Sequence, residues 1–250
     1  MIRIFVDPAV LAAGELVVRG DEHHYLAHVR RARPGEPVEL VDGAGRRAAA
    51  TIARMSAGET ALIAGPPAPI APAPPRVRAL LPLIKGDRMD SCIEKLVEVG
   101  VDAIVVWPAA RSVARLDDAR RDARLARYRA IAQAATRQSG RAQVPDVTAA
   151  ASLAAAVAGL PAGQRLVLDP ATDATLALAL DHGTGAATGA SAGAGGTDDV
   201  TIVSGPEGGL TAGERDQLAG FAPLGLGPRV LRADTAPVVA VALIRAATRS

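Results

Sequence analysis

The sequence predicts an α/β protein whose main part is a parallel sheet with helices on both faces, preceded by a small β-barrel. The first observation is a proline-rich segment, residues 67–75, because clustered prolines stop both helices and central strands. The second is a change of pattern across that segment. Short β-type runs separated by turns give way to alternating strand-like and helical runs. We therefore expect one domain at residues 1–66 and another at residues 76–250, joined by a linker.

The first domain is expected to be a barrel of short strands interrupted by one helix at about residues 22–32. Its strand-like runs are residues 2–6, 15–18, 38–41, 47–53 and 60–64. The helix has an apolar stripe of Tyr25, Leu26 and Val29. Its basic residues either offer a surface to phosphates or form an ordinary solvated face: His23, His24, His28, Arg30, Arg31 and Arg33.

The second domain alternates strands and helices. Strand-like runs are residues 77–84, 103–106, 166–169 and 200–204, and helical runs are residues 89–99, about 119–138 and about 237–247. Asp87 is placed to cap the first of these helices and Gly100 to end it. Residues 183–198 are mostly Gly, Ala, Ser and Thr, so we expect a flexible loop there and assign it no chemistry.

Composition narrows the class of protein. The net charge of +2 permits a local basic surface for nucleic acid but does not require one. No apolar run is long enough to span a bilayer and the N-terminus lacks a secretory pattern, so we expect a cytoplasmic protein. The single Cys92 cannot form an internal disulfide, and the histidines show no ligand spacing with Cys or carboxylates. No metal is expected.

The sharpest local motif is residues 203–211, Val-Ser-Gly-Pro-Glu-Gly-Gly-Leu-Thr, which leaves an apolar strand and enters a helix. Its glycines allow backbone N–H groups to approach a ligand, and Thr211 with Glu214 predicts a capping box at the helix start. An ordinary βα turn is the alternative, because the spacing matches neither the dinucleotide fingerprint nor a phosphate-binding P-loop.

A second motif, residues 224–236, again combines strand-like residues and glycines before a helix that Asp234 or Thr235 is placed to cap. Two arginines, Arg229 and Arg232, lie in this tight loop. For a single Arg in an Arg-rich chain, solvation or pairing with a carboxylate is the ordinary explanation.

Six blocks together are more specific than either motif alone. They are 85–90 (Lys-Gly-Asp-Arg-Met-Asp), 95–101 (Lys-Leu-Val-Glu-Val-Gly-Val), 111–113 (Arg-Ser-Val), 138–141 (Gln-Ser-Gly-Arg), 205–209 (Gly-Pro-Glu-Gly-Gly) and 226–232 (Leu-Gly-Pro-Arg-Val-Leu-Arg). In this order they resemble the RsmE family of the SPOUT superfamily, the uridine-N3 methyltransferases of small-subunit (16S) ribosomal RNA. The chain departs from the family pattern at Ala110 and Asp234, where Glu is usual, and at Thr136-Arg137, where an acidic residue is common.

The resemblance implies S-adenosylmethionine as cofactor and a trefoil knot in the second domain. It also implies a PUA-like first domain, a homodimer, and ribosomal RNA, free or within the assembled small subunit, as substrate. Glu207 either faces the cationic end of the ligand or braces its own loop. The implied cofactor residues are Leu168, Gly205, Pro206, Glu207, Gly208, Gly209, Leu226, Gly227, Leu231 and Thr235.

The chemistry of the implied reaction indicates a catalytic role for the two arginines of the second motif. Uracil N3 carries a proton at neutral pH, and its loss spreads negative charge onto the flanking carbonyl oxygens. A guanidinium beside those oxygens stabilises that charge, so we assign catalysis to Arg229 first and Arg232 second.

RNA contacts are expected from basic residues outside this loop. Arg120, Arg124 and Arg127 recur at helical spacing and form one stripe, which either contacts phosphates or is a solvated face with local pairs such as Asp117 with Arg121. The candidate RNA-binding residues are Arg30, Arg31, Lys85, Arg88, Arg111, Arg120, Arg124 and Arg141.

Three other functions remain open from the sequence. A non-catalytic RNA-binding or ribosome-assembly protein could keep this fold, and a methyltransferase of the same superfamily could act on another RNA position. A nucleotide-dependent enzyme on a doubly wound sheet needs a glycine fingerprint after its first strand, whereas the glycine loops here come late.

Overall fold

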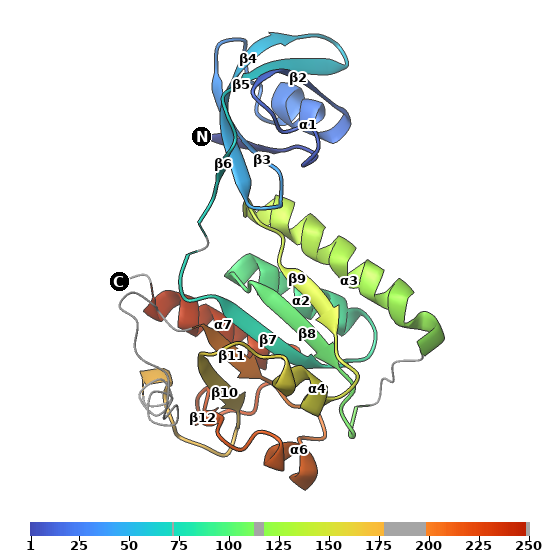
Figure 1. Ribbon diagram of the computed structural model, residues 1–250, viewed down its shortest axis with the longest axis vertical. Helices are drawn as coiled ribbons and strands as arrows, with labels where there is room; N and C mark the ends of the chain where they lie inside the picture. Colours follow the sequence, from blue (N-terminus) through green and yellow to red (C-terminus); the bar gives the residue numbers. More distant parts are fainter. Residues whose placement is uncertain (72, 113–117, 178–198, 249–250) are drawn as a thin grey trace. The chain divides into compact units, whose positions relative to one another are not determined.

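The computed structural model (Figure 1) describes residues 1–71, 73–112, 118–177 and 199–248. The chain forms two compact units. One contains Met1–Pro72 with Thr136–Val144, and the other contains Ala73–Ala135 with Pro145–Ser250. The expected flexible loop at residues 183–198 lies outside the described ranges.

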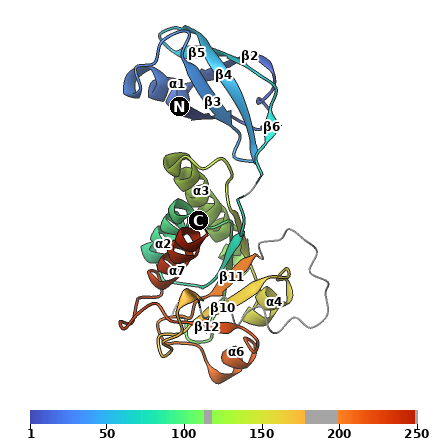
Figure 2. The ribbon, with the colours of Figure 1, turned by 90° about the vertical axis from the view of Figure 1, so that its left-hand side faces the viewer.

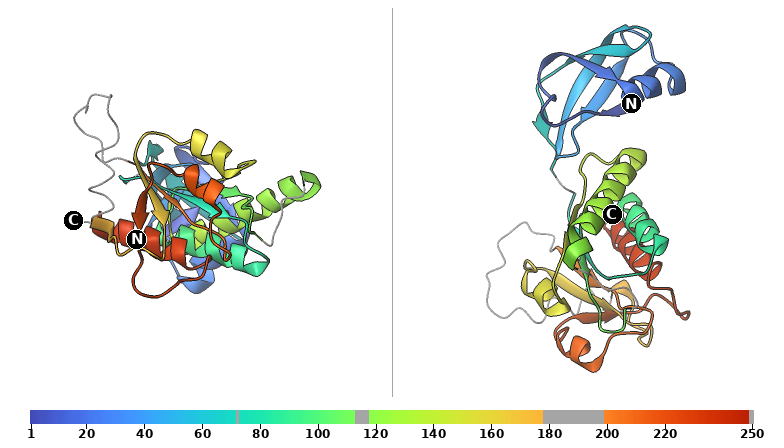
Figure 3. Two further views of the ribbon diagram at one scale, coloured as in Figure 1. Left: turned by 90° about the horizontal axis from the view of Figure 1, so that it is seen from below. Right: turned by 90° about the vertical axis from the view of Figure 1, so that its right-hand side faces the viewer.

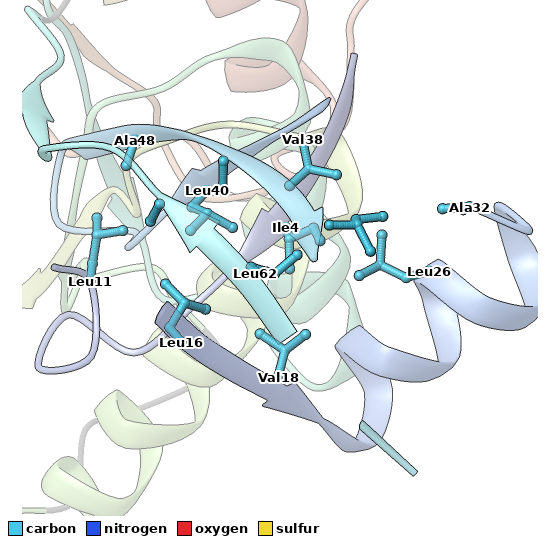
Figure 4. Close-up of a cluster of buried hydrophobic side chains, with 13 residues drawn as sticks. Ile4, Leu11, Leu16, Val18, Leu26, Ala32, Val38, Leu40, Ala48 and Leu62 are labelled. Carbon is cyan, nitrogen blue, oxygen red and sulfur yellow. The ribbon is translucent and has the colours of Figure 1, made fainter. Parts of the chain in front are cut away.

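The first unit is built on a mostly antiparallel sheet. Its strands are β1 (Ile2–Phe5), β2 (Gly14–Arg19), β3 (Pro37–Val41), β4 (Arg46–Met55), β5 (Glu59–Ala64) and β6 (Ala68–Pro69). The order is β1-β3-β4-β5-β2, with β1 parallel to β3, and β6 pairs with β4 although it lies within the proline-rich segment. Alternate residues of these strands point inward, and Figure 4 shows Leu16, Leu40 and Leu62 gathered with Leu26 of the helical segment in a closed core.

The helical segment of the first unit differs from its prediction in two ways. It begins earlier, as α1 (Gly20–His24), and continues as a single π-helical turn, η1 (Tyr25–Val29). His23, which we placed on the basic stripe, is buried, and its Nδ1 lies 2.9 Å from Thr60 Oγ1. That assignment was wrong because His23 lies three residues before the buried Leu26 and shares its face of the helix, beside Thr60 of β5, while His24, Arg30 and Arg31 remain exposed.

The second unit is a parallel sheet in the order β12-β10-β11-β7-β8-β9. Its strands are β7 (Val77–Pro82), β8 (Ala103–Trp107), β9 (Asp146–Ala149), β10 (Gln164–Leu168), β11 (Val200–Val203) and β12 (Ala222–Leu224). The described helices are α2 (Asp87–Val99), α3 (Asp118–Ser139), α4 (Leu153–Ala158), α6 (Ala212–Asp216) and α7 (Ala236–Ala247). Figures 2 and 3 show α2 and α7 on one face of the sheet and α4 on the other. The predicted α/β class is confirmed.

The residues predicted to begin and end α2 and α7 are only partly confirmed. Gly100 ends α2 in the left-handed conformation, with φ 109°, as predicted. Asp87 does not cap this helix, because Gly86 is the N-cap and Asp87 is already helical. Neither predicted cap closes α7, since Thr235 forms no side-chain capping bond and Asp234 instead lies 3.2 Å from Arg232 Nε.

A partly buried arginine secures α7 to the sheet. Arg245 donates to the carbonyl oxygens of Gly100 and Pro75, at 2.9 and 2.7 Å, and pairs with Asp102. These bonds join the last helix to the segments that enter β7 and β8. They therefore fix the C-terminal end of α7 against the sheet.

Candidate active site

A cavity of about 590 Å³ lies at the carboxyl ends of β10, β11 and β12. Its wall comes from residues 167–171, residues from 204 to 210 and residues from 224 to 236, together with Arg215 and Leu218. Parallel sheets place their ligand sites at this edge because the loops after adjacent strands converge there. The volume is that of a site for a small organic ligand.

The strand order brings the two glycine motifs together. The predicted cofactor residues that line the cavity are Leu168, Gly205, Pro206, Glu207, Gly209, Leu226, Gly227 and Leu231. Gly208 and Thr235 lie outside its wall. Gly208 instead packs against Arg111, where a Cβ would lie 3.1 Å from the Arg111 Cβ.

The first glycine loop is braced from behind by Glu214, at the start of α6. Thr211 and Glu214 form the predicted capping box: Glu214 N–H donates to Thr211 Oγ1 at 3.2 Å, and Thr211 N–H to Glu214 Oε2 at 2.8 Å. Ala110 N–H, in the loop after β8, donates to the other carboxylate oxygen at 2.9 Å. Burial raises the pKa of Glu214, but the donors from Ala110 and Thr211 outweigh it and hold that pKa below its ordinary value.

Arg111 completes this brace. Its guanidinium donates to the carbonyl oxygen of Gly208 at 3.0 Å. The loop after β8 therefore contacts the glycine loop through Arg111 and contacts α6 through Ala110. Ala110, one of the departures from the family pattern, uses only its backbone here, so this contact does not depend on its side chain.

The second glycine loop carries the two candidate catalytic arginines, and both line the cavity. Gly225 lies so close to the chain after β10 that a Cβ would be 2.2 Å from Thr172 O. Arg232 pairs with Asp234, whereas the side chain of Arg229 forms no hydrogen bond or ion pair with any residue in the described ranges. Arg229 is exposed, so its charge faces the cavity and solvent.

Several residues in the wall were not predicted. Asp169 follows β10 and lies 3.5 Å from Arg215, and both line the cavity. Ser204 lines it from the end of β11, and the 81% exposed Val230 lines it between the two arginines. Asp169 was detectable as the polar last residue of the predicted strand 166–169, but its place beside residues 204–210 depends on the order of β10 and β11. Glu207 lies 3.9 Å from Arg88.

The candidate RNA-binding residues are distributed over both units. Arg30, Arg31, Lys85, Arg88, Arg111 and Arg120 are exposed, and Arg124 and Arg141 are half-buried. In the proposed basic stripe on α3, the charge of the third arginine is paired: Arg127 pairs with Asp90 and lies 3.9 Å from Asp87. Asp117, which was considered as a partner of Arg121, lies outside the described ranges, and Arg121 donates to Ala149 O.

Two absences apply to the described part of the chain. Its residues contain no group of three His, Cys, Asp or Glu side chains arranged to hold a metal ion. None of its helices combines the length and the apolar character needed to cross a membrane.

Comparisons with known proteins agree with this architecture. Residues 71–245 match the RNA methyltransferase domain family, and residues 18–60 match the RNA methyltransferase PUA domain family. Ribosomal RNA small subunit methyltransferase E of Mycobacterium bovis is 35% identical over 242 residues, covering 96% of this chain and 89% of the relative. The protein of the same name from Bacillus subtilis is 29% identical over 239 residues, covering 91% and 88%.

Solved structures show the same fold. The crystal structure of ribosomal RNA small subunit methyltransferase E from Neisseria gonorrhoeae bound to S-adenosylmethionine has a TM-score of 0.75 and 26% identity, covering 99% of this chain and 98% of that one. A putative Legionella pneumophila methyltransferase in complex with the same cofactor has a TM-score of 0.74 and 26% identity, covering 98% and 97%. Fold, cavity and domain matches define an RNA methyltransferase with a PUA-like first domain. Within that class, the chain belongs to the ribosomal RNA small subunit methyltransferase E family, as the six sequence blocks predicted.

Proposed function

We propose that this protein uses S-adenosylmethionine to methylate N3 of a uridine in small-subunit ribosomal RNA. The observation that carries the proposal is the cavity at the carboxyl ends of β10, β11 and β12, with Arg229, which pairs with none of the described residues, in its wall. The relatives named above are small-subunit ribosomal RNA methyltransferases, and two of the similar structures contain S-adenosylmethionine.

The wall of the cavity suits this cofactor. Leu210, Leu218 and Leu224 are buried and give an apolar surface suited to adenine. Asp169 and Glu207 supply carboxylates for the cationic groups of the methionine part, and arginines lie nearby for its carboxylate. When bound, S-adenosylmethionine supplies an electrophilic methyl group, so the residues of this chain mainly position and polarise.

The residues of the second loop act on the base. A uracil whose N3 faces the cavity must lose a proton, and the resulting charge spreads over its two flanking carbonyl oxygens. The guanidinium of Arg229 stabilises this charge, because no carboxylate in the part of the chain that the structure describes competes for it. Arg232 is the second catalytic candidate, and its charge is partly offset by Asp234 at 3.2 Å.

Further features of the proposal come from the family resemblance. We propose that the second unit contains a trefoil knot, that the protein is a cytoplasmic homodimer, and that the assembled small subunit is a substrate. The sheet order supports the knot. Strand β11 lies between β7 and β10, although it comes after both of them in the sequence. Light scattering tests the dimer, and methylation of naked 16S RNA compared with purified small subunits tests the substrate.

Mass-spectrometric mapping of small-subunit RNA from cells with and without the gene tests the function. We expect one N3-methylated uridine to disappear with the gene and to return with the wild-type gene but not with Arg229→Ala. An unchanged pattern would contradict the proposal. Loss of a methyl group from another position would support the methyltransferase class but would show that the target is a different nucleotide.

Calorimetric titration with S-adenosylmethionine separates the enzyme from the non-catalytic alternative, which requires no cofactor binding.

A further inference from the structure

One serine hydroxyl beside the cavity has no partner in the described chain. Ser204 directly follows β11, and its backbone N–H donates to Leu80 O at 3.2 Å. The residue is 2% exposed, and its Oγ forms no hydrogen bond with any described residue. Buried polar groups are normally paired, so an orphaned hydroxyl in a cavity wall indicates a missing ligand or water.

The position of Ser204 distinguishes it from the other polar groups of the wall. Glu207, Arg215 and Arg232 have side chains 46%, 59% and 58% exposed, and Asp169, at 25%, pairs with Arg215, so these charged groups are either solvated or paired. The buried residues next to Ser204 are apolar: Val203 of the core precedes it, and Leu210 of the cavity wall lies 3.2 Å from the position of a Gly205 Cβ. An uncharged hydroxyl in such surroundings is matched to an uncharged polar group of a ligand.

We infer that the Ser204 hydroxyl hydrogen-bonds the adenosine part of the methyl donor, an inference that rests on the proposed function. Adenine and ribose offer neutral donors and acceptors, whereas the methionine part is charged. A hydroxyl both donates and accepts, and rotation about one torsion gives it three staggered positions from which to reach the ligand. The bond satisfies a group that folding alone leaves unpaired.

Ser204→Ala tests this inference with two measurements: ligand affinity, which should fall, and the melting temperature without ligand, which should not. Calorimetric Kd values are measured for S-adenosylmethionine, S-adenosylhomocysteine and 5′-methylthioadenosine, which share the adenosine part. We expect all three to bind about five- to tenfold more weakly to the variant. The melting temperature of the ligand-free variant should equal or exceed that of the wild type, because an unpaired buried hydroxyl has been removed.

Thr201→Val is the matched control, since Thr201 is buried in β11, the strand that Ser204 follows, but does not line the cavity. Its three Kd values should equal those of the wild type. Unchanged Kd values for Ser204→Ala, or a lower melting temperature without ligand, would overturn the inference while leaving the proposed function intact. Weakening confined to the two ligands with an amino-acid part would also overturn it, by moving the contact to the methionine end. Failure of the wild type to bind any of the three would overturn the proposed function itself.

Discussion

The two glycine loops that enclose the cavity are held in different ways. The first, residues 205–210, accepts a hydrogen bond from the Arg111 guanidinium at Gly208 O, and the residue that follows it, Thr211, is bonded with Ala110 to the Glu214 carboxylate. The second, residues 225–235, carries Arg229 without a partner in the described chain and the largely exposed Val230. A braced loop suits a cofactor that must be held in one orientation, whereas a loop with an unpaired charge suits a substrate that supplies the missing contact.

The largest effect that tests this contrast is expected from Arg229→Ala. The variant should lower kcat by roughly 100-fold or more and leave the calorimetric Kd for S-adenosylmethionine within about threefold, because the guanidinium acts on the base. Arg229→Lys serves as control and should restore only part of the rate, since an ammonium keeps the charge but lacks the planar fork. A variant with wild-type turnover would remove Arg229 from the mechanism.

Backbone packing of the second loop gives the next effect. Gly225→Ala places a Cβ 2.2 Å from Thr172 O, so either the loop or the chain after β10 must shift. We expect the free energy of unfolding to fall by about 1–3 kcal/mol and cofactor affinity to fall with it. Gly213→Ala, in α6, meets nothing within 4 Å and should be neutral or slightly stabilising. Denaturant unfolding of both variants measures the difference, and equal stabilities would show that the second loop adapts freely.

The hydrogen bonds of the Glu214 carboxylate predict that the stability of the protein depends on pH. Glu214→Gln should lower stability by about 1–2 kcal/mol at neutral pH, because one carboxylate accepts hydrogen bonds from two separate segments. The folded-state pKa of Glu214 lies below its ordinary value of 4.5, so this stabilisation is present above that pH and is lost as pH falls through the folded-state pKa. Melting curves of wild type and variant should therefore converge in acid.

A control variant separates the contact between Glu214 and the loop after β8 from the capping of α6. Thr211→Val removes the hydroxyl of the capping box but leaves the bond between Ala110 and Glu214. It should destabilise α6 with a smaller loss of cofactor affinity than Glu214→Gln. If the two variants lose equal affinity, the contact to the loop after β8 does not position the glycine loop.

The same contrast shows what sequence alone could predict. The capping box and the glycine loops are local, because each depends on residues a few positions apart, and the structure contains the predicted box. The roles of Ser204, Asp169 and Arg215 depend on β10 lying between β11 and β12, an order that periodicity does not encode. Strand β9 was missed because it is short, and helix α4 because it is short and alanine-rich, although Ser152 caps α4. His23 was misplaced because its spacing of three residues from the buried Leu26, which puts both on one helix face, was overlooked.

The smallest expected effect concerns Arg232. Its ion pair with Asp234 is half-exposed, so Arg232→Ala should change stability by less than about 1 kcal/mol. If Asp234 offsets the charge of Arg232, as their separation of 3.2 Å indicates, Arg232→Ala should lower kcat by only about tenfold, a smaller loss than for Arg229→Ala. Asp234→Asn then removes the offset and should leave kcat unchanged or raise it. A loss of rate in Asp234→Asn as large as in Arg232→Ala would mean instead that the pair acts as a unit, with the carboxylate holding the guanidinium in position.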